Sequence, residues 1–202
     1  MNRLVVLISG GGSNLQALID AIAGGTLSAG IGLVVSNRAD AFGLERAKQA
    51  GIETLCLPLD LQSSTRVTYD SRVARHIAKA GADLIILAGW MHVFSPAFLD
   101  RFPGKVINLH PALPGAFPGT RAIERALDAF KRGEIAQTGV MVHEVIAEID
   151  AGPVLGTRVV PIEAADTVAT LSARMHTAEH ELLVEVVRGM TARRVHAGSS
   201  LE

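Results

Sequence analysis

An amide and an imidazole stand two positions apart in this chain, at Asn108 and His110, and Pro111 follows directly. Residues two apart on a strand point to the same face, and the proline restricts His110 to extended backbone. An amide N–H can stabilise a developing oxyanion while an imidazole holds or moves a proton, so the pair suits acyl-transfer chemistry. The same residue types also occur at strand ends simply as hydrogen-bonding partners of a loop, and the pair alone leaves both interpretations open.

A carboxylate that could complete the pair is Asp150, which lies just before Gly152 and Pro153. As a partner of His110, it would raise the pKa of the imidazole and fix the orientation of the ring. As an Asx-type turn former, it would have only a structural role. The sequence leaves these two interpretations open.

A glycine-rich loop over residues 9–14, Ser-Gly-Gly-Gly-Ser-Asn, separates a predicted strand from a predicted helix. Glycines let backbone N–H groups approach an anion, and the N-terminus of the following helix favours negative charge. A dinucleotide site would need a glycine where Leu15 stands and an acid where Ser36 and Asn37 stand, and no Walker lysine follows. A lone phosphate monoester therefore fits better than a nicotinamide or triphosphate nucleotide. In the alternative interpretation the loop is a tight turn whose side chains only cap the helix.

Other catalytic chemistries find no support in the residue pattern. A Gly-x-Ser-x-Gly nucleophile elbow does not occur in the sequence. His176 and His180 lack a third ligand in the sequence, so we expect no metal site. The single cysteine, Cys56, excludes an internal disulfide and any multi-cysteine metal site, and its apolar neighbours predict that it is a small buried hydrophobe.

The composition indicates one ordinary globular domain with a large core. Of the 202 residues, 49% are hydrophobic and 19% are charged, and the net charge of −1 argues against nucleic acid or acidic lipid as a partner. Only 4% are aromatic, too few for platforms that stack single-stranded bases. With no signal-peptide pattern and no apolar stretch of membrane-spanning length, we expect a cytoplasmic protein without a membrane partner.

Five aliphatic runs predict strands buried on both faces, and helical segments alternate with them. The predicted strands are residues 4–8, 31–35, 54–57, 84–88 and 106–109, and the predicted helices are residues 14–23, 41–50, 65–80 and 96–101. Such alternation is typical of right-handed βαβ units. We therefore expect an α/β fold with a doubly wound, mostly parallel sheet and helices on both faces.

The second half of the chain predicts a change in the sheet. After a loop at 111–119 and a helix at 120–132, two predicted strands at 139–143 and 154–161 follow each other without a helix between them. The sheet should therefore become mixed at this edge. A long helix over 166–189, with Asp166 as its N-cap, closes the domain. We expect a single domain over 1–190 and a C-terminal tail over 191–202 that can include a cloning remnant.

These motifs, in this order, resemble the folate-dependent phosphoribosylglycinamide formyltransferases. The resemblance runs from Leu4 to about Val187, and it rests on five segments at 12–16, 36–44, 87–91, 108–111 and 150–154. The Asn-x-His-Pro and Asp-x-Gly-Pro motifs are shared with other formyl-folate enzymes, while the Gly-Ser-Asn-Leu loop points to the glycinamide ribonucleotide branch. The resemblance implies the formyltransferase fold over 1–190 and transfer of a formyl group from 10-formyltetrahydrofolate to the amine of glycinamide ribonucleotide, the third step of purine biosynthesis.

The resemblance also implies roles for particular residues. Asn108 and protonated His110 would stabilise the oxyanion of the tetrahedral intermediate, and His110 would donate a proton. Asp150 would raise the pKa of His110 and accept, directly or through water, the proton that the amine loses. Glycinamide ribonucleotide would contact Gly12, Ser13, Asn14, His176, Thr177, Ala178 and Glu179, with Glu179 binding ribose hydroxyls. The folate would contact Arg66, Met91, His92, Val93, Phe94, Asn108, Ile146, Ala147, Glu148, Ile149 and Asp150, with the backbone of residues 91–94 reading the pterin edge.

The sequence departs from the family pattern around the expected cleft. His92 stands where Arg is common, Arg121 where His is frequent, Met141 where Thr or Ser is frequent, and Pro114 marks a displaced proline. These changes put side-chain contacts in the cleft in question and leave the three predicted catalytic residues intact. His143 is a further residue of interest, either as a group that orients active-site water or as a packed strand residue.

Three other functions stay open beside this one. They are a formyltetrahydrofolate hydrolase that releases formate, the catalytic module of methionyl-tRNA formyltransferase, and a non-catalytic module that binds a phosphate ligand. The hydrolase typically has an N-terminal regulatory domain and the tRNA enzyme a basic C-terminal RNA-binding domain, and this chain has neither the length nor the charge for them. We therefore expect small-molecule substrates, no nucleic acid partner, and a monomer or homodimer.

Overall fold

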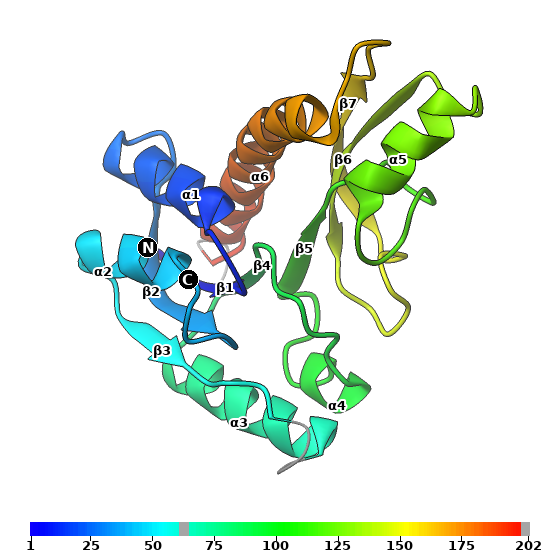
Figure 1. The fold of residues 1–202 in the computed structure, drawn as a ribbon. Coiled ribbons are helices and arrows are strands. Elements are labelled where there is room, and N and C mark those ends of the chain that lie inside the picture. The colour runs from blue at the N-terminus through cyan, green and yellow to red at the C-terminus, as the bar shows by residue number, and fades with distance from the viewer. Residues whose placement is uncertain (61–64, 199–202) are drawn as a thin grey trace.

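The computed structural model describes residues 1–60 and 65–198, and in them strands and helices alternate as an α/β fold (Figure 1). The strands are β1 Asn2–Ile8, β2 Ala29–Ser36, β3 Thr54–Cys56, β4 Leu84–Leu87, β5 Val106–His110, β6 Gln137–Glu144 and β7 Val154–Pro161. The helices are α1 Ser13–Ala23, α2 Gly43–Gln49, α3 Arg66–Lys79, α4 Pro96–Leu99, α5 Ala122–Lys131 and α6 Val168–Gly198.

The strands form one sheet in the order β3-β2-β1-β4-β5-β6-β7. Strands β1 to β5 run parallel to one another. Strand β6 pairs antiparallel with β5, and β7 pairs antiparallel with β6. The prediction of a mostly parallel sheet that becomes mixed at one edge is confirmed. The β5–β6 register places Asn108 opposite His143, which brings two polar side chains of the site together.

Both faces of the central strands are buried, which explains their unbroken aliphatic runs. On β1, Leu4, Val6 and Ile8 pack into a cluster with α1, α2, α5 and α6, while Val5 and Leu7 pack on the other face with α3 and α4. This alternation follows from the two-residue period of a strand. Figure 1 shows α3 and α4 below the sheet and α1 and α6 above it.

A crevice is expected at the carboxyl end of β1, because the chain leaves β1 and its neighbour β4 toward opposite faces of the sheet. The connection after β1 leads to α1, in the first cluster, and the connection after β4 leads to α4, in the second. The Ser9 N–H donates to the Gly89 carbonyl at 3.0 Å, and the Met91 N–H donates to the Ser9 hydroxyl at 2.8 Å. These bonds join the two loops at the base of the crevice.

Cys56 is exposed, so its predicted burial was wrong. It ends β3, which has three residues and lies at the edge of the sheet, where only one neighbouring strand covers it. Strand position in the sheet, which a local apolar run does not reveal, decides the exposure.

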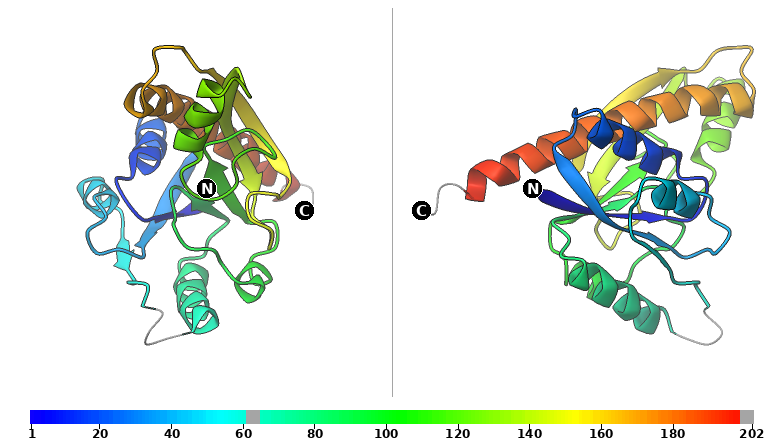
Figure 2. Two further views of the ribbon diagram at one scale, coloured as in Figure 1. Left: turned by 45° about the vertical axis from the view of Figure 1, so that its right-hand side comes forward. Right: turned by 90° about the vertical axis from the view of Figure 1, so that its left-hand side faces the viewer.

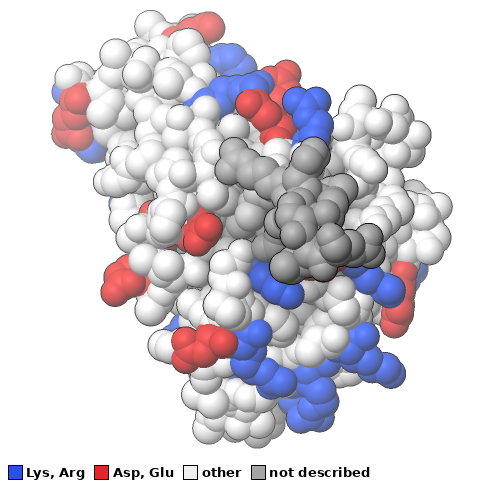
Figure 3. Space-filling view, turned by 180° about the vertical axis from the view of Figure 1, so that it is seen from behind, with Lys and Arg blue, Asp and Glu red and all other residues white. Residues whose placement is uncertain are grey.

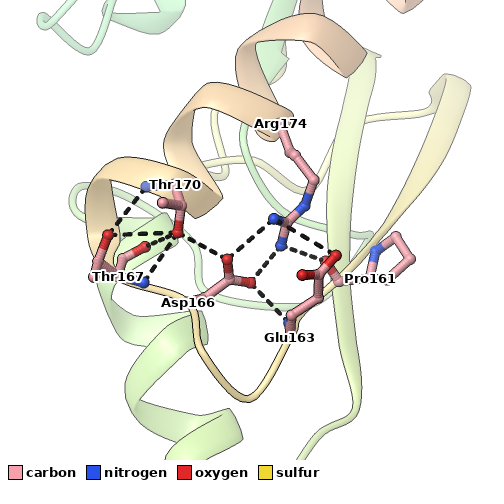
Figure 4. A network of polar contacts seen from close by, with 6 residues as sticks. All are labelled: Pro161, Glu163, Asp166, Thr167, Thr170 and Arg174. Atoms are coloured by element: carbon pink, nitrogen blue, oxygen red, sulfur yellow. Dashed lines mark hydrogen bonds and ion pairs between the residues drawn. The ribbon is translucent and has the colours of Figure 1, made fainter.

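The last helix begins later and ends later than predicted. Helix α6 starts at Val168, and the Thr167 hydroxyl accepts the Thr170 N–H at 3.2 Å, so Thr167 rather than Asp166 caps the helix. The Asp166 carboxylate instead accepts the Glu163 N–H at 2.7 Å and the Thr170 hydroxyl at 2.8 Å, and it pairs with Arg174 (Figure 4). It therefore closes the turn that joins β7 to α6.

Beyond residue 189, α6 continues to Gly198 and runs past the start of β1 (Figure 2). The Asn2 side-chain amide donates to the Thr191 carbonyl at 2.9 Å. The helix thus crosses the expected boundary at residue 190 without interruption, and the division into a domain and a tail stays a prediction.

The surface mixes charges of both signs. Seen from behind, acidic and basic side chains are interspersed, and Lys and Arg gather at the lower edge, where α3 lies (Figure 3). Exposed Arg72, Arg75 and Lys79 belong to this helix. In the ranges that the structure describes, none of the helices combines the length and the apolar character that a membrane crossing requires.

Candidate active site

A cavity of about 720 Å³ opens at the carboxyl ends of the parallel strands. Its walls come from the loops that follow β1, β4 and β5, from the β6–β7 turn and from one face of α6. A volume of this size suits a small-molecule ligand. Segments far apart in sequence thus meet in one place, as the strand-end motifs predict.

The amide, the imidazole and the carboxylate converge inside this cavity. The Asn108 amide nitrogen donates to Asp150 Oδ1 at 3.2 Å, and His110 Nδ1 lies 3.3 Å from Asp150 Oδ2. The side chains of His110 and Asp150 are 5% and 10% exposed, so both groups act in a largely desolvated setting. Of the two interpretations of Asp150, the pairing with His110 is the one that the geometry supports.

The backbone of the β6–β7 turn aims the carboxylate into the cavity. Asp150 has a φ of 53°, which a non-glycine residue rarely adopts, and its Oδ2 accepts the Gly119 N–H at 2.8 Å. A Cβ on Gly152 would lie 1.9 Å from the Glu144 carbonyl oxygen, so only glycine fits there. The Asp-x-Gly motif therefore serves a turn that doubles back on β6 and presents Asp150 at its tip.

A second imidazole orients the amide. His143 Nδ1 lies 2.8 Å from the Glu144 carbonyl, which can only accept, so this nitrogen holds the proton. His143 Nε2 lies 3.2 Å from the Asn108 amide nitrogen and 3.5 Å from Asp150 Oδ1, so it accepts from the amide when the ring is neutral and can donate to Asp150 when the ring is protonated. Both amide hydrogens of Asn108 are thus directed by acceptors, one neutral and one charged. An oxyanion could replace the neutral imidazole as the acceptor, because a charged acceptor binds the same donor more strongly.

The protonation of the pair follows from burial and hydrogen bonding. Burial acts to raise the pKa of Asp150, but contacts with His143, the Gly119 N–H and the His110 ring outweigh it, so the pKa lies below its usual value and the group is ionised. Burial lowers the pKa of His110 and outweighs the nearby Asp150, which acts to raise it. Asp150 thus acts on the pKa of His110 in the expected direction, but the net shift is downward because burial has the larger effect.

The geometry nevertheless favours the imidazolium once a proton arrives. His110 Nε2 lies 3.1 Å from the Phe117 carbonyl and so holds a proton, which leaves Nδ1 as the free position facing Asp150. Protonation of Nδ1 would create a charge-assisted bond to the carboxylate. The site is thus arranged to hold a neutral His110 when empty and to stabilise a positive one when negative charge develops beside it.

The glycine loop of residues 9–14 forms one end of the cavity. Gly12 has a φ of 71°, and Ser13 and Asn14 begin α1, so backbone N–H groups at a helix N-terminus face this end. The Asn14 amide donates to Glu179 Oε2 at 3.1 Å, while among the described residues its buried Oδ1 has no hydrogen-bond partner. Burial raises the pKa of Glu179 above its usual value, although Asn14 and His176 act to lower it.

On α6, only part of the predicted binding segment reaches the cavity. His176 and Glu179, which are three apart and share a helix face, both line it. Thr177 does not line it, and its hydroxyl donates to the Ala173 carbonyl at 3.3 Å. Ala178 packs in the core and does not line it either. Two of the four predicted residues thus line the cavity, because a helix presents only every third or fourth residue to one side, and the contact of all four with a ligand stays a prediction.

The opposite end of the cavity is formed by the 91–94 segment and the 146–150 turn, as expected for Met91, His92, Val93, Phe94, Ile146, Glu148, Ile149 and Asp150. Met91, Val93, Ile146 and Ile149 are exposed apolar side chains there, which suits a flat, partly apolar ligand. Ala147 is exposed and does not line the cavity. Arg66 does not line the cavity either, and its guanidinium donates to the Phe94 carbonyl at 2.8 Å. The predicted contact of Arg66 with the folate therefore stays a prediction.

The imidazole of His92 is anchored behind this wall. His92 Nε2 lies 2.7 Å from Asp70 Oδ1, and Asp70 Oδ2 accepts the Ser95 N–H at 2.7 Å. Burial acts to raise the pKa of Asp70, but these bonds lower it below its usual value. The ring also packs edge-on against Tyr69 and Phe94. The departure at His92 therefore leaves a cavity-lining residue whose imidazole is bound to Asp70 and helps to hold the backbone of the wall.

Residues 2–187 match the formyl transferase family. The chain belongs to this family. The phosphoribosylglycinamide formyltransferase of Dictyostelium discoideum is 45% identical, over 95% of this chain and 98% of that protein. The enzyme of the same name from Escherichia coli is 41% identical, over 92% of this chain and 85% of that protein.

Solved structures agree with the fold of this formyl transferase. The phosphoribosylglycinamide formyltransferase of Coxiella burnetii, in complex with CHES, superposes with a TM-score of 0.87 at 40% identity, over 96% of this chain and 88% of that one. The glycinamide ribonucleotide transformylase 1 of Symbiobacterium toebii gives a TM-score of 0.86 at 38% identity, over 93% and 86%. The predicted fold class and the predicted family are thereby confirmed.

Several residues at the cavity of this formyl transferase were not predicted. Ser9 joins the loops after β1 and β4, Arg38 lies just beyond the end of β2, and Arg121 lies at the start of α5. Arg38 could have been found by the strand-end rule, since it follows a predicted parallel strand. Arg121 reaches the cavity through a backbone φ of 57°, and no local pattern indicates that conformation.

Proposed function

We propose that this enzyme transfers the formyl group of 10-formyltetrahydrofolate to the amine of glycinamide ribonucleotide, the third step of purine biosynthesis. The observation that supports this most is the convergence of Asn108, His110 and Asp150 between an anion-binding loop and an apolar wall. The names of the relatives support the same substrate. A cytoplasmic location and a monomeric or homodimeric state stay predictions.

In this proposal the ribonucleotide lies across the end of the cavity formed by the glycine loop. Its phosphate binds the N–H groups of Gly12, Ser13 and Asn14, where positive helix-end charge favours an anion. The ribose hydroxyls donate to Glu179, whose carboxyl group lines this end of the cavity and is held by the Asn14 amide. His176 lies at the rim on the same face of α6 and adds a donor.

The folate lies against the apolar wall. The backbone of residues 91–94 offers hydrogen bonds to the pterin edge, and the 146–150 turn covers the ring system. The formyl group then lies near Asn108 and Asp150, where the two ends of the cavity meet. The ribonucleotide amine and the formyl carbon are thereby brought together, and such pre-positioning removes much of the entropic barrier.

The neutral amine attacks the formyl carbon and forms a tetrahedral intermediate whose oxygen is negative. The Asn108 amide and the protonated His110 stabilise that oxygen, and each such donor lowers the barrier by about 3 kcal/mol. Asp150 accepts the proton that the amine loses, directly or through water. His110 releases its Nε2 N–H from the Phe117 carbonyl and supplies the proton that the folate nitrogen gains as its bond to the formyl carbon breaks. The proton on Asp150 then returns to His110, and the products are formylglycinamide ribonucleotide and tetrahydrofolate.

The test mixes the enzyme with glycinamide ribonucleotide and a 10-formyl folate and follows the deformylated folate by its near-ultraviolet absorbance. We expect turnover that depends on the ribonucleotide and that falls by about two orders of magnitude or more in His110→Ala. No turnover would refute the proposal. Equal turnover without the ribonucleotide would instead identify a hydrolase that releases formate.

A further inference from the structure

Helix α2 packs against the outer side of the glycine loop. The Gly43 N–H donates to the Gly10 carbonyl at 3.0 Å, and Arg46 Nε donates to the Gly11 carbonyl at 2.9 Å. A second nitrogen of the same guanidinium, NH1, donates to Gln16 Oε1 on α1 at 3.1 Å. Arg46 thus joins α2 to both the loop and the helix that the loop starts.

The backbones of the loop and α2 touch. A Cβ on Gly12 would lie 2.6 Å from the Gly43 Cα, and a Cβ on Gly43 would lie 2.4 Å from Ile8 Cδ1. The guanidinium of Arg46 also lies over the ring of Phe42, with 5.0 Å between Cζ and the ring centre. The position of α2 against the loop is therefore closely defined, and the orientation of Arg46 is fixed from two sides.

The direction of the carbonyl groups determines the direction of the amides. In a planar trans peptide, the carbonyl and the following N–H point in opposite directions. The Gly10 and Gly11 carbonyls point at α2, so the N–H groups of Gly11 and Gly12 point away from it. Gly11 and Gly12 line the cavity, whereas Arg46 does not.

We propose that Arg46 is a positioning residue for the phosphate site: it holds the Gly11–Gly12 peptide so that its N–H faces the anion, without touching the ligand itself. The assignment of this anion as the phosphate of the ribonucleotide rests on the proposed function. The positioning role predicts an effect on one substrate only, because α2 is remote in sequence and contact from the 91–94 segment and the 146–150 turn.

The first test is a split between kinetic constants. In Arg46→Met, which keeps an aliphatic stem beside Phe42 but removes the donors, we expect KM for glycinamide ribonucleotide to rise about tenfold, equivalent to about 1.4 kcal/mol. KM for the folate and kcat should stay within about twofold of their wild-type values. The substitution weakens binding of the ribonucleotide equally in the ground state and in the transition state, so only its KM changes. Lys48→Ala is the matched control on the same helix, because Lys48 is exposed and forms an ion pair with Glu45 on that helix. A rise in both KM values, or a fall in kcat alone, would overturn the proposal.

The second test separates geometry from charge and does not depend on turnover. Binding of inorganic phosphate is measured by calorimetry for the wild type, Arg46→Met and Arg46→Lys at low and high salt. If Arg46 acts by positioning the loop, the ratio of the phosphate affinities of the variant and the wild type is the same at both salt concentrations. If it acts through its charge at long range, high salt screens the interaction and this ratio approaches one. We expect weaker phosphate binding in Arg46→Met at both concentrations and only partial rescue by Arg46→Lys, whose single ammonium lacks the fork of a guanidinium. Full rescue by lysine, or an effect that disappears in salt, would overturn the positioning role even if the wild type transfers formyl groups as proposed.

Discussion

Replacing Asp150 with Asn tests the proton chemistry most directly, because it removes one charge and preserves shape. The Asp150 carboxylate lies 3.3 Å from His110 Nδ1 in a nearly desolvated setting. At an effective dielectric constant of about 20, a full charge pair at that separation is worth about 5 kcal/mol. An amide oxygen retains part of this as an acceptor, so we expect a loss of about 3 kcal/mol of transition-state stabilisation. That corresponds to a fall in kcat of about a hundredfold or more.

The same substitution should move the pKa of His110 in a defined direction. Burial lowers this pKa, Asp150 acts to raise it, and His143 and Arg125 act to lower it. Removing the only one of these charges that favours the imidazolium should therefore lower the pKa of His110 further. The pKa is measured by NMR titration of the ring protons, in the wild type and in Asp150→Asn.

The control is Asp128→Asn, which removes one exposed carboxylate from α5 and leaves the cavity unchanged. It should leave both kcat and the pKa of His110 near their wild-type values. A kcat in Asp150→Asn within about threefold of the wild type, or a His110 pKa that stays constant or rises, would refute the coupling of the two groups. An unchanged KM for the folate would show that the turn keeps its position.

Three further predictions concern other parts of the molecule. Asn108→Ala should lower kcat about a hundredfold with little change in either KM, as steady-state kinetics will show. Asp70→Asn should weaken the anchor of the 91–94 segment and raise KM for the folate several-fold, and the fluorescence of Trp90, the single tryptophan, should report the displacement. Asp166→Asn should lower the melting temperature at neutral pH. Because Arg174 and its other partners hold the pKa of Asp166 below the unfolded value, this difference should shrink progressively once the pH falls below the pKa of an ordinary carboxyl group.

The central strands could be predicted from the sequence because both of their faces are buried, which makes every position apolar. Residues 4–8 and 84–88 are apolar at every position, and in the structure both faces of β1 and β4 are buried. The edge strand β3 is also an apolar run, but it has a neighbouring strand on one side only. The burial of Cys56 was therefore predicted wrongly. The start of α6 was missed because Asp166 and Thr167 are both good caps, and only the position of Arg174 decides which side chain is engaged elsewhere.

The residues of the candidate site that lie at strand ends could be predicted from the sequence. Features that depend on how the chain folds back on itself could be predicted less well. Asn108 and His110 followed from strand spacing, and the register with β6 then brought His143 beside them. The direction of the His110 pKa did not follow, because burial is a property of the assembled cavity. Arg121 was missed for a similar reason, since its place depends on a left-handed backbone conformation.

Backbone packing, more than side-chain identity, determines the geometry of this cavity. Gly12 and Gly152 are the positions where an added Cβ would meet backbone atoms of a neighbouring segment at 2.6 Å and 1.9 Å. The contact at Gly12 determines how closely the glycine loop packs against α2. The contact at Gly152 determines how far the turn that carries Asp150 extends into the cavity. A side chain at either point would displace a whole loop, whereas an exchange at His92 would alter the contacts of one side chain.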